Sequence, residues 1–306
     1  MDIEQQVQLL KEKLIRRRRD LHKHPESGWL EYRTSAIVAD ELTKLGFQVH
    51  VGKEVCKPES RMGVPSAEVL QAHEKRALAE GANPMWLERM HGGHTGVVGV
   101  LRTGRPGPVI ALRFDIDSNE LTESDSEAHR PARDGFASCH PGMMHACGHD
   151  GHTSIGLGVA EIVSRSADQL LGEIRLLFQP AEEGTRGAKS MVDAGWLNGV
   201  EYFFAGHIAS RSRTLGEIVA SIGGFLATTK MNVVFNGRAA HAGSSPHEGR
   251  NALLAAAASA LHLHGISRHG EGPTRVNVGM LVAGSGRNII PDRAEMKLEI
   301  RGERRN

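Results

Sequence analysis

The stretch MMHACGHDGHT, residues 143–153, combines one cysteine, three histidines and an aspartate. Cys147 and His149 lie two residues apart, after a predicted loop and just before a predicted helix. A thiolate and an imidazole held in such a turn can bind one metal ion or two adjacent ions. Because single cysteines and histidines are more often structural, the stretch alone leaves two interpretations open, a metal site and an ordinary histidine-rich loop.

Two further groups of polar side chains follow apolar strands. The predicted strand GEIRLLFQP leads into the adjacent carboxylates Glu182 and Glu183. Neighbouring side chains of an extended segment point in opposite directions, so one carboxylate could bind a metal while the other faces a water molecule beside the substrate. His207 ends the apolar strand YFFAGH, and α/β proteins bind ligands at the carboxyl ends of strands. A solvated glutamate pair and a structural histidine are the alternatives.

A fourth group of candidate residues lies in turns nearer the C-terminus. His241 belongs to the small-residue turn of AAHAGSSPHEGRNA, and Arg287 and Asn288 follow the Gly-Ser-Gly turn of GSGRNIIPD. Turns of this kind allow backbone and side chains to approach a ligand closely. Flexible loops without a ligand have the same composition, so the spacing alone does not decide.

The elements that must position these residues alternate between helices and strands. Apolar residues at helical spacing predict helices over residues 3–22, 34–45, 154–167 and 184–194, and a helix-rich insertion over 64–91. Short apolar runs predict strands over 46–52, 95–104, 108–117, 172–180 and 201–208. This alternation indicates an α/β fold whose parallel or mixed sheet has helices on both faces.

The pattern changes near residue 214. A long strand-like stretch over 216–237 is followed by an Ala/Leu helix over 251–266 and by strands over 274–284 and 294–303. This order predicts a separate α+β domain of about one hundred residues. We therefore expect one domain over residues 1–213 and a second over 214–306.

Composition excludes several classes of protein. Lys plus Arg number 37 and Asp plus Glu 36 in 306 residues, so no overall charge attracts nucleic acid or an anionic membrane. The basic run Arg16–Arg19 lies in an amphipathic segment and is read as a solvated helix face. No apolar run approaches the ~20 residues that span a bilayer. Three irregularly spaced cysteines fit reduced thiols, and we expect a cytoplasmic protein.

The motifs taken together resemble one enzyme family. HPESGWLEYRT, MMHACGHDGHT, FQPAEEG, GHI, AHAGSSPHEGRNA and GSGRNIIPD occur in this order. In this order they resemble the amidohydrolase branch of the dinuclear metallopeptidases, which includes aminoacylases, hippurate hydrolases and auxin-conjugate hydrolases. Within that branch, ESRMGVP, HRPARDGFASC and AEEGTRGAKSMVDAG are similar to the members that hydrolyse p-aminobenzoyl-glutamate. The resemblance covers nearly the whole chain.

This resemblance implies a fold and a chemistry. The fold would be a mixed-sheet dinuclear metallopeptidase domain with an inserted α+β lid or dimerisation domain. The reaction would be hydrolysis of an amide between an aryl or acyl group and an amino acid, with p-aminobenzoyl-glutamate as the expected substrate. Two divalent ions, Mn²⁺ or Zn²⁺, would be held by four ligands: Cys147, His149, Glu183 and His207.

The resemblance also assigns the remaining candidate residues. Glu182 matches the general base, and His241 matches a second-domain residue that assists the oxyanion, usually across a dimer. Asn288 and Arg287 match residues that contact the substrate and its carboxylate. A homodimer, or a heterodimer with a related second subunit, is implied, with a small-molecule substrate and neither nucleic acid nor membrane as a partner.

Members of the branch continue well past the length of this chain and carry a last histidine ligand near their C-terminus. The resemblance therefore implies a C-terminally truncated chain in which both domains are incomplete and one metal position is under-coordinated. A catalytically impaired truncated homologue or a non-catalytic partner subunit of such a hydrolase is one alternative, and a structural zinc protein is another. The presence of Glu182 beside the ligand set favours the enzyme, because a binding module has no use for a general base.

Overall fold

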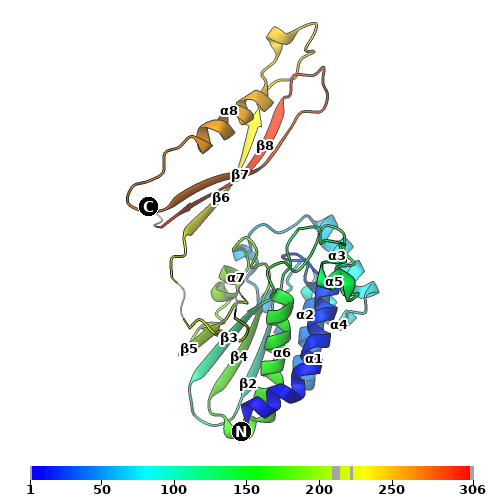
Figure 1. Cartoon of the computed structure of the whole chain (residues 1–306), viewed down its shortest axis with the longest axis vertical. Coiled ribbons are helices and arrows are strands. Elements are labelled where there is room, and N and C mark those ends of the chain that lie inside the picture. Colours follow the sequence, from blue (N-terminus) through cyan, green and yellow to red (C-terminus); the bar gives the residue numbers. More distant parts are fainter. Residues whose placement is uncertain (1, 209–213, 221–222, 304–306) are drawn as a thin grey trace. The chain divides into compact units, whose positions relative to one another are not determined.

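The computed structural model describes residues 2–208, 214–220 and 223–303. The chain divides into two compact units, Met1–Arg213 and Thr214–Asn306. Each unit has its own sheet and its own helices (Figure 1). The catalytic and lid roles expected for these two parts of the chain remain predictions.

The first unit is built on a five-stranded sheet. Its strands are β1 (Gln48–Val51), β2 (Val97–Arg102), β3 (Val109–Asp115), β4 (Glu173–Gln179) and β5 (Tyr202–Ala205). Its α-helices are α1 (Ile3–Lys23), α2 (Tyr32–Lys44), α3 (Ala67–Ala79), α4 (Pro84–Met90), α5 (Arg130–Arg133), α6 (His149–Arg165) and α7 (Ala188–Asp193). The short 3-10 helices are η1 (Gly52–Glu54), η2 (Pro58–Ser60) and η3 (Ala167–Gln169).

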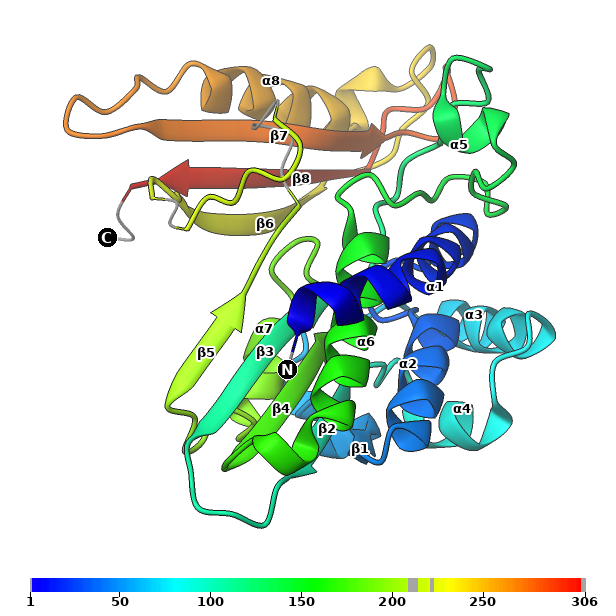
Figure 2. The same cartoon turned by 60° about the horizontal axis from the view of Figure 1, so that its bottom comes forward.

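The sheet is mixed, as the sequence predicted. Its strand order is β1-β2-β4-β3-β5. β3 runs parallel to both β4 and β5, whereas β2 runs antiparallel to β4. The carboxyl ends of β3, β4 and β5 therefore lie at one edge, where Asp115 pairs in register with Gln179. In Figure 2, α1 and α6 lie in front of this sheet and α7 lies behind it.

Two apolar cores cover the two faces of the sheet. Along β4, side chains alternate, because successive residues of a strand point to opposite faces. Phe178 packs with Leu42 of α2 and Leu157 of α6, whereas Leu177 packs in the second core with Met191 of α7. All five side chains are at most 5% exposed, and burial of each one stabilises the fold by about 1.5–3 kcal/mol.

A glycine sets the distance between α6 and the sheet. A Cβ atom added at Gly156 would lie 2.7 Å from the ring of Phe178 and 2.8 Å from that of Phe114. Real Cβ atoms do not approach other atoms so closely, so any larger residue would push α6 away from β3 and β4. Because α6 begins at His149, this packing also determines where the predicted metal ligand lies.

The second unit is an antiparallel sheet with one long helix. Its elements are β6 (Ala227–Asn236), η4 (Pro246–Glu248), α8 (Ala252–His264), β7 (Thr274–Ala283) and β8 (Arg293–Gly302). The strand order is β6-β8-β7. Ala252 and Ala256 of α8 pack on Ala294 of β8, and their small side chains allow the helix to lie close to the sheet.

Three expectations about the elements were wrong. β5 ends at Ala205, so His207 lies beyond the strand rather than at its end. α7 begins only at Ala188, because residues 182–185 form a turn. In the second unit, the described residues before Ala227 are not in a strand.

Candidate metal centre

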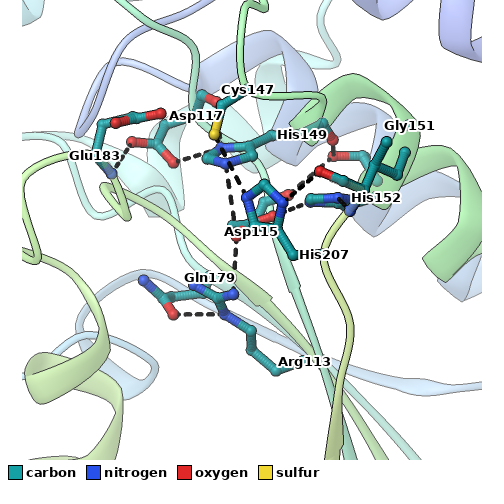
Figure 3. A network of polar contacts seen from close by, with 12 residues as sticks. Arg113, Asp115, Asp117, Cys147, His149, Gly151, His152, Gln179, Glu183 and His207 are labelled. Atoms are coloured by element: carbon teal, nitrogen blue, oxygen red, sulfur yellow. Dashed lines mark hydrogen bonds and ion pairs between the residues drawn. The ribbon is translucent and has the colours of Figure 1, made fainter. Parts of the chain in front are cut away.

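The carboxyl edge of the first unit's sheet gathers the four residues expected to bind metal. Ligand atoms of Cys147, His149 and Glu183 all lie within 4.8 Å of one another. The Sγ atom of Cys147 lies 3.4 Å from Nε2 of His207. Figure 3 shows the thiol and the two imidazoles pointing toward one another. The structure therefore brings together side chains from the loop before α6, the start of α6, the turn after β4 and the segment after β5.

Asp117 is a residue that the sequence analysis did not select. Its Oδ2 atom accepts a hydrogen bond from the backbone N–H of Glu183 at 2.8 Å. Its backbone oxygen lies 2.8 Å from Nδ1 of His149. A carbonyl oxygen only accepts, so Nδ1 of His149 carries a hydrogen and Nε2 is the ring nitrogen that faces the cluster. Metal-binding histidines are commonly oriented in this way.

Asp115 and His152 were also missed, although His152 lies three residues after His149 on the same helical face. Nδ1 of His152 is hydrogen-bonded to Oδ1 of Asp115. The backbone N–H of Ile208 donates to Nε2 of His152 at 2.8 Å. With both ring nitrogens engaged, His152 positions the segment that carries His207. The strand ending RFDID, with two aspartates on alternate residues, was the signal that could have identified Asp115 and Asp117.

The donor set fits divalent metal ions. Nε2 of His149 and Oε1 of Glu183 are buried, and neither has a hydrogen-bond partner among the residues that the structure describes. A buried polar atom without a partner costs about 1–3 kcal/mol, and a cation would remove that cost for both atoms. Thiolate, imidazole and carboxylate are the ligands of zinc sites, and imidazole and carboxylate also suit manganese.

Burial and nearby charges shift the pKa values of three groups in the cluster. Although burial opposes it, the hydrogen bond to Asp117 and the charge of Asp115 raise the pKa of His149 to about 9. Burial, followed by the charge of Glu183, raises the pKa of Cys147 to about 12. Burial and then the charge of Asp117 raise the pKa of Glu182 above its usual value. In the absence of metal, the cluster therefore holds protons that a cation would displace.

Glu182 and Glu183 lie in a tight turn, not in the extended segment that the sequence predicted. The backbone N–H of Thr185 donates to the carbonyl of Glu182 at 2.6 Å. Ala181, which begins this turn, has a φ of 49°, a left-handed conformation that a non-glycine residue seldom adopts. Its N–H donates to Oε1 of Glu31 at 2.7 Å. The buried Glu31 side chain therefore holds the turn in place.

The other three candidate residues belong to the second unit and are close to one another there. Nδ1 of His241 accepts hydrogen bonds from the backbone N–H groups of Gly243 and Ser244, both at 3.1 Å. The N–H of Ala242 donates to the carbonyl of Asn288 at 2.9 Å. Arg287, beside Asn288, is exposed. Within this unit, two turns that are distant in sequence are thus held side by side.

Comparison with known proteins gives the family. A model of peptidase family M20/M25/M40 matches residues 111–289. One of the subunits of p-aminobenzoyl-glutamate hydrolase from Escherichia coli is 52% identical over 300 residues, which are 98% of this chain and 69% of that protein. No helix of the described residues combines the length and the apolar character needed to cross a membrane.

Two solved structures have the same fold. The aminobenzoyl-glutamate utilization protein of Klebsiella pneumoniae is 44% identical with a TM-score of 0.77, over 99% of this chain and 70% of that one. A dinuclear metal-binding peptidase of the M20 family from Bacillus subtilis is 27% identical with a TM-score of 0.59, over 97% of this chain and 66% of that one. The chain belongs to peptidase family M20/M25/M40, whose solved members include dinuclear metal-binding enzymes that act on amide bonds.

Proposed function

We propose that this chain is part of an amidohydrolase that cleaves p-aminobenzoyl-glutamate into p-aminobenzoate and glutamate. The observation that carries the proposal is the convergence of Cys147, His149, Glu183 and His207 at one sheet edge, beside Glu182. The relatives named for aminobenzoyl-glutamate support this choice of substrate. The chain spans 69% of the E. coli relative and 70% of the Klebsiella protein, so the activity is proposed for the protein as a whole.

The four ligand residues are assigned two divalent ions, zinc or manganese. Such ions polarise the scissile carbonyl and lower the pKa of a water molecule when they are bound. The thiolate of Cys147 favours zinc because it is a soft ligand, whereas the carboxylate and the imidazoles also suit manganese. Asp117 fixes His149 with its Nε2 atom toward the ions, and His152 positions the segment that follows β5.

Glu182 is assigned the transfer of the proton. Its carboxylate accepts a proton from the attacking water and returns it to the nitrogen of the leaving amino acid. In the metal-free site, burial and the nearby charge of Asp117 raise the pKa of Glu182. His241 is assigned to the oxyanion, and Arg287 and Asn288 to the substrate carboxylate, which a guanidinium fork matches in shape and charge.

The test separates the two adjacent glutamates. We expect Glu182→Gln to lose activity by about 10²–10⁴-fold while it retains its metal, because general base catalysis contributes about that factor. Glu183→Gln should lose metal as well as activity. Release of p-aminobenzoate and metal content by elemental analysis are measured on both variants and on the unchanged protein. Equal metal loss in the two variants would refute this division of roles.

We also propose a dimer, either of identical chains or with a related second subunit, since the similar E. coli protein is named as one subunit of its hydrolase. The other candidate function follows from the same name, namely a non-catalytic partner subunit. The purified chain, assayed alone with saturating Mn²⁺ or Zn²⁺, distinguishes the two candidates. The three free cysteines support a reducing compartment, the cytoplasm, as its location.

A further inference from the structure

A second set of possible metal ligands lies in the first unit, outside the centre described above. Ligand atoms of Glu80, Cys139 and His140 all lie within 4.8 Å of one another. Glu80 is the C-cap residue that follows α3, and the other two residues follow α5. The backbone N–H of Cys139 donates to the carbonyl of Lys23 at 2.9 Å. This cluster therefore joins the ends of α1 and α3 to the loop that leads to Cys147.

The hydrogen bonds of His140 indicate a place for a cation. Its Nδ1 atom lies 2.8 Å from the carbonyl oxygen of Pro25, which only accepts, so Nδ1 carries a hydrogen. Its Nε2 atom lies 2.6 Å from Oε1 of Glu80. A lone pair on Nε2 would repel a lone pair of this carboxyl group, so a hydrogen lies between the two atoms. Displacement of that hydrogen would free both atoms to bind a metal ion.

Two further observations favour a metal ion. Oε2 of Glu80 is buried and has no hydrogen-bond partner among the described residues, so the carboxylate has an unused ligand atom. The carbonyl of Pro25 orients His140, as carbonyl oxygens commonly orient metal-binding histidines, and the side chain of His140 is only 6% exposed. Cys139 is exposed, which leaves a route by which an ion can enter.

We propose that Glu80, Cys139 and His140 bind one divalent cation of the zinc type, separate from the centre that contains Cys147. One nitrogen, one sulfur and one oxygen donor, with water in the fourth position, form a zinc coordination shell. Binding displaces the hydrogen between Nε2 of His140 and Glu80, and also the proton on the thiol of Cys139. The positive charges of Lys23 and Arg76 act on Cys139, and they weaken the site relative to one formed by thiolates alone.

The experiment uses the thiol of Cys139 as the reporter in a Cys147→Ser background, which removes the other accessible thiol. Alkylation by iodoacetamide is followed by peptide mass spectrometry with and without Zn²⁺. A zinc-bound thiol is withdrawn from reaction, so we expect zinc to slow alkylation of Cys139 by at least about tenfold. Cys56 is 0% exposed, and its lack of reaction shows that the protein stays folded.

Variants of the other two ligands complete the test. Glu80→Gln and His140→Gln should each abolish the protection by zinc. His91→Gln is the matched control, because His91 pairs with Glu74 at 2.9 Å on the surface without a cysteine, and it should keep the protection. In parallel, Co²⁺ added to the Cys147→Ser protein should give a thiolate-to-cobalt absorption band that disappears in Cys147→Ser/Cys139→Ser. Equal alkylation rates with and without zinc, or no such band, would overturn the proposal.

Discussion

Replacement of Glu31 by glutamine tests how the turn that carries Glu182 is held. Glu31 is fully buried. Its two carboxyl oxygens accept hydrogen bonds from the N–H of Ala181 at 2.7 Å and from the hydroxyl of Thr95 at 2.6 Å. Burial, and then the charge of Asp117, raises the pKa of Glu31 to about 8. A glutamine has the shape of the protonated carboxyl and accepts the Ala181 bond equally well.

The direction in which stability changes with pH follows from the raised pKa of Glu31. The ordinary value for this group is 4.5, so below that pH the carboxyl is protonated in both folded and unfolded protein. Between 4.5 and about 8 the unfolded chain ionises first, and the wild-type protein loses stability as the pH rises. One pKa unit corresponds to about 1.4 kcal/mol, so the loss amounts to at most about 5 kcal/mol. Glu31→Gln has no such loss.

The assay is urea unfolding of the metal-free protein at about pH 5 and about pH 8, the two ends of the interval. We expect Glu31→Gln to equal the wild type or fall slightly below it at the lower pH, and to exceed it at the higher pH. Thr95→Val is the companion variant, because loss of that hydroxyl raises the pKa of Glu31 further and extends the decline to higher pH. If the wild-type and Glu31→Gln proteins showed the same pH dependence, Glu31 would be ionised throughout and this reasoning would fail.

Three further outcomes are expected. Cys147→Ser should lower metal affinity, measured by competition with a chelator, because a hydroxyl is a poor anionic ligand at neutral pH; unchanged affinity would make Cys147 structural. Leu42→Ala should reduce the free energy of unfolding by about 2–5 kcal/mol, because Leu42 is 0% exposed. Burial opposes the shift, but hydrogen bonds from His24 and Arg33 lower the pKa of Asp20 to about 2. The ionised Asp20 therefore stabilises the fold above its ordinary pKa of 3.8, and this stabilisation is lost as the pH falls toward 2. Asp20→Asn should lack this loss of stability when unfolding is measured across the acid range.

Residues that are close in sequence were the predictable part of the centre. Cys147 and His149 share one short stretch, and the apolar runs before Glu182 and His207 placed both residues near a sheet edge. The expected mixed sheet followed from alternating periodicities of helix and strand. These inferences depend only on local spacing and on the resemblance of the motifs.

The residues that were missed depend on pairing between distant segments. Asp117 reaches His149 and Glu183 only because β3 and β4 lie side by side in parallel register. The segment with Glu182 was predicted to be extended, but it forms a turn. A contact with a residue far away in the sequence determines its conformation. Ala181 takes its left-handed conformation with a hydrogen bond to Glu31, 150 residues away in the sequence. No periodicity within the stretch FQPAEEG carries that information.

The parallel pairing of β3 with β4 also has a consequence for how quickly the metal centre can form. Strands joined by a long crossover pay the entropy of closing that loop before any contact is gained, so they assemble slowly. Cys147 and His149 become neighbours as soon as α6 begins to form, whereas Glu183 and His207 arrive only after β4 and β5 have joined β3. We therefore expect a two-ligand site to form before the four-ligand site during refolding. Metal ions present at that stage meet weak ligands first, and the rate at which tight binding appears should follow sheet assembly rather than metal concentration.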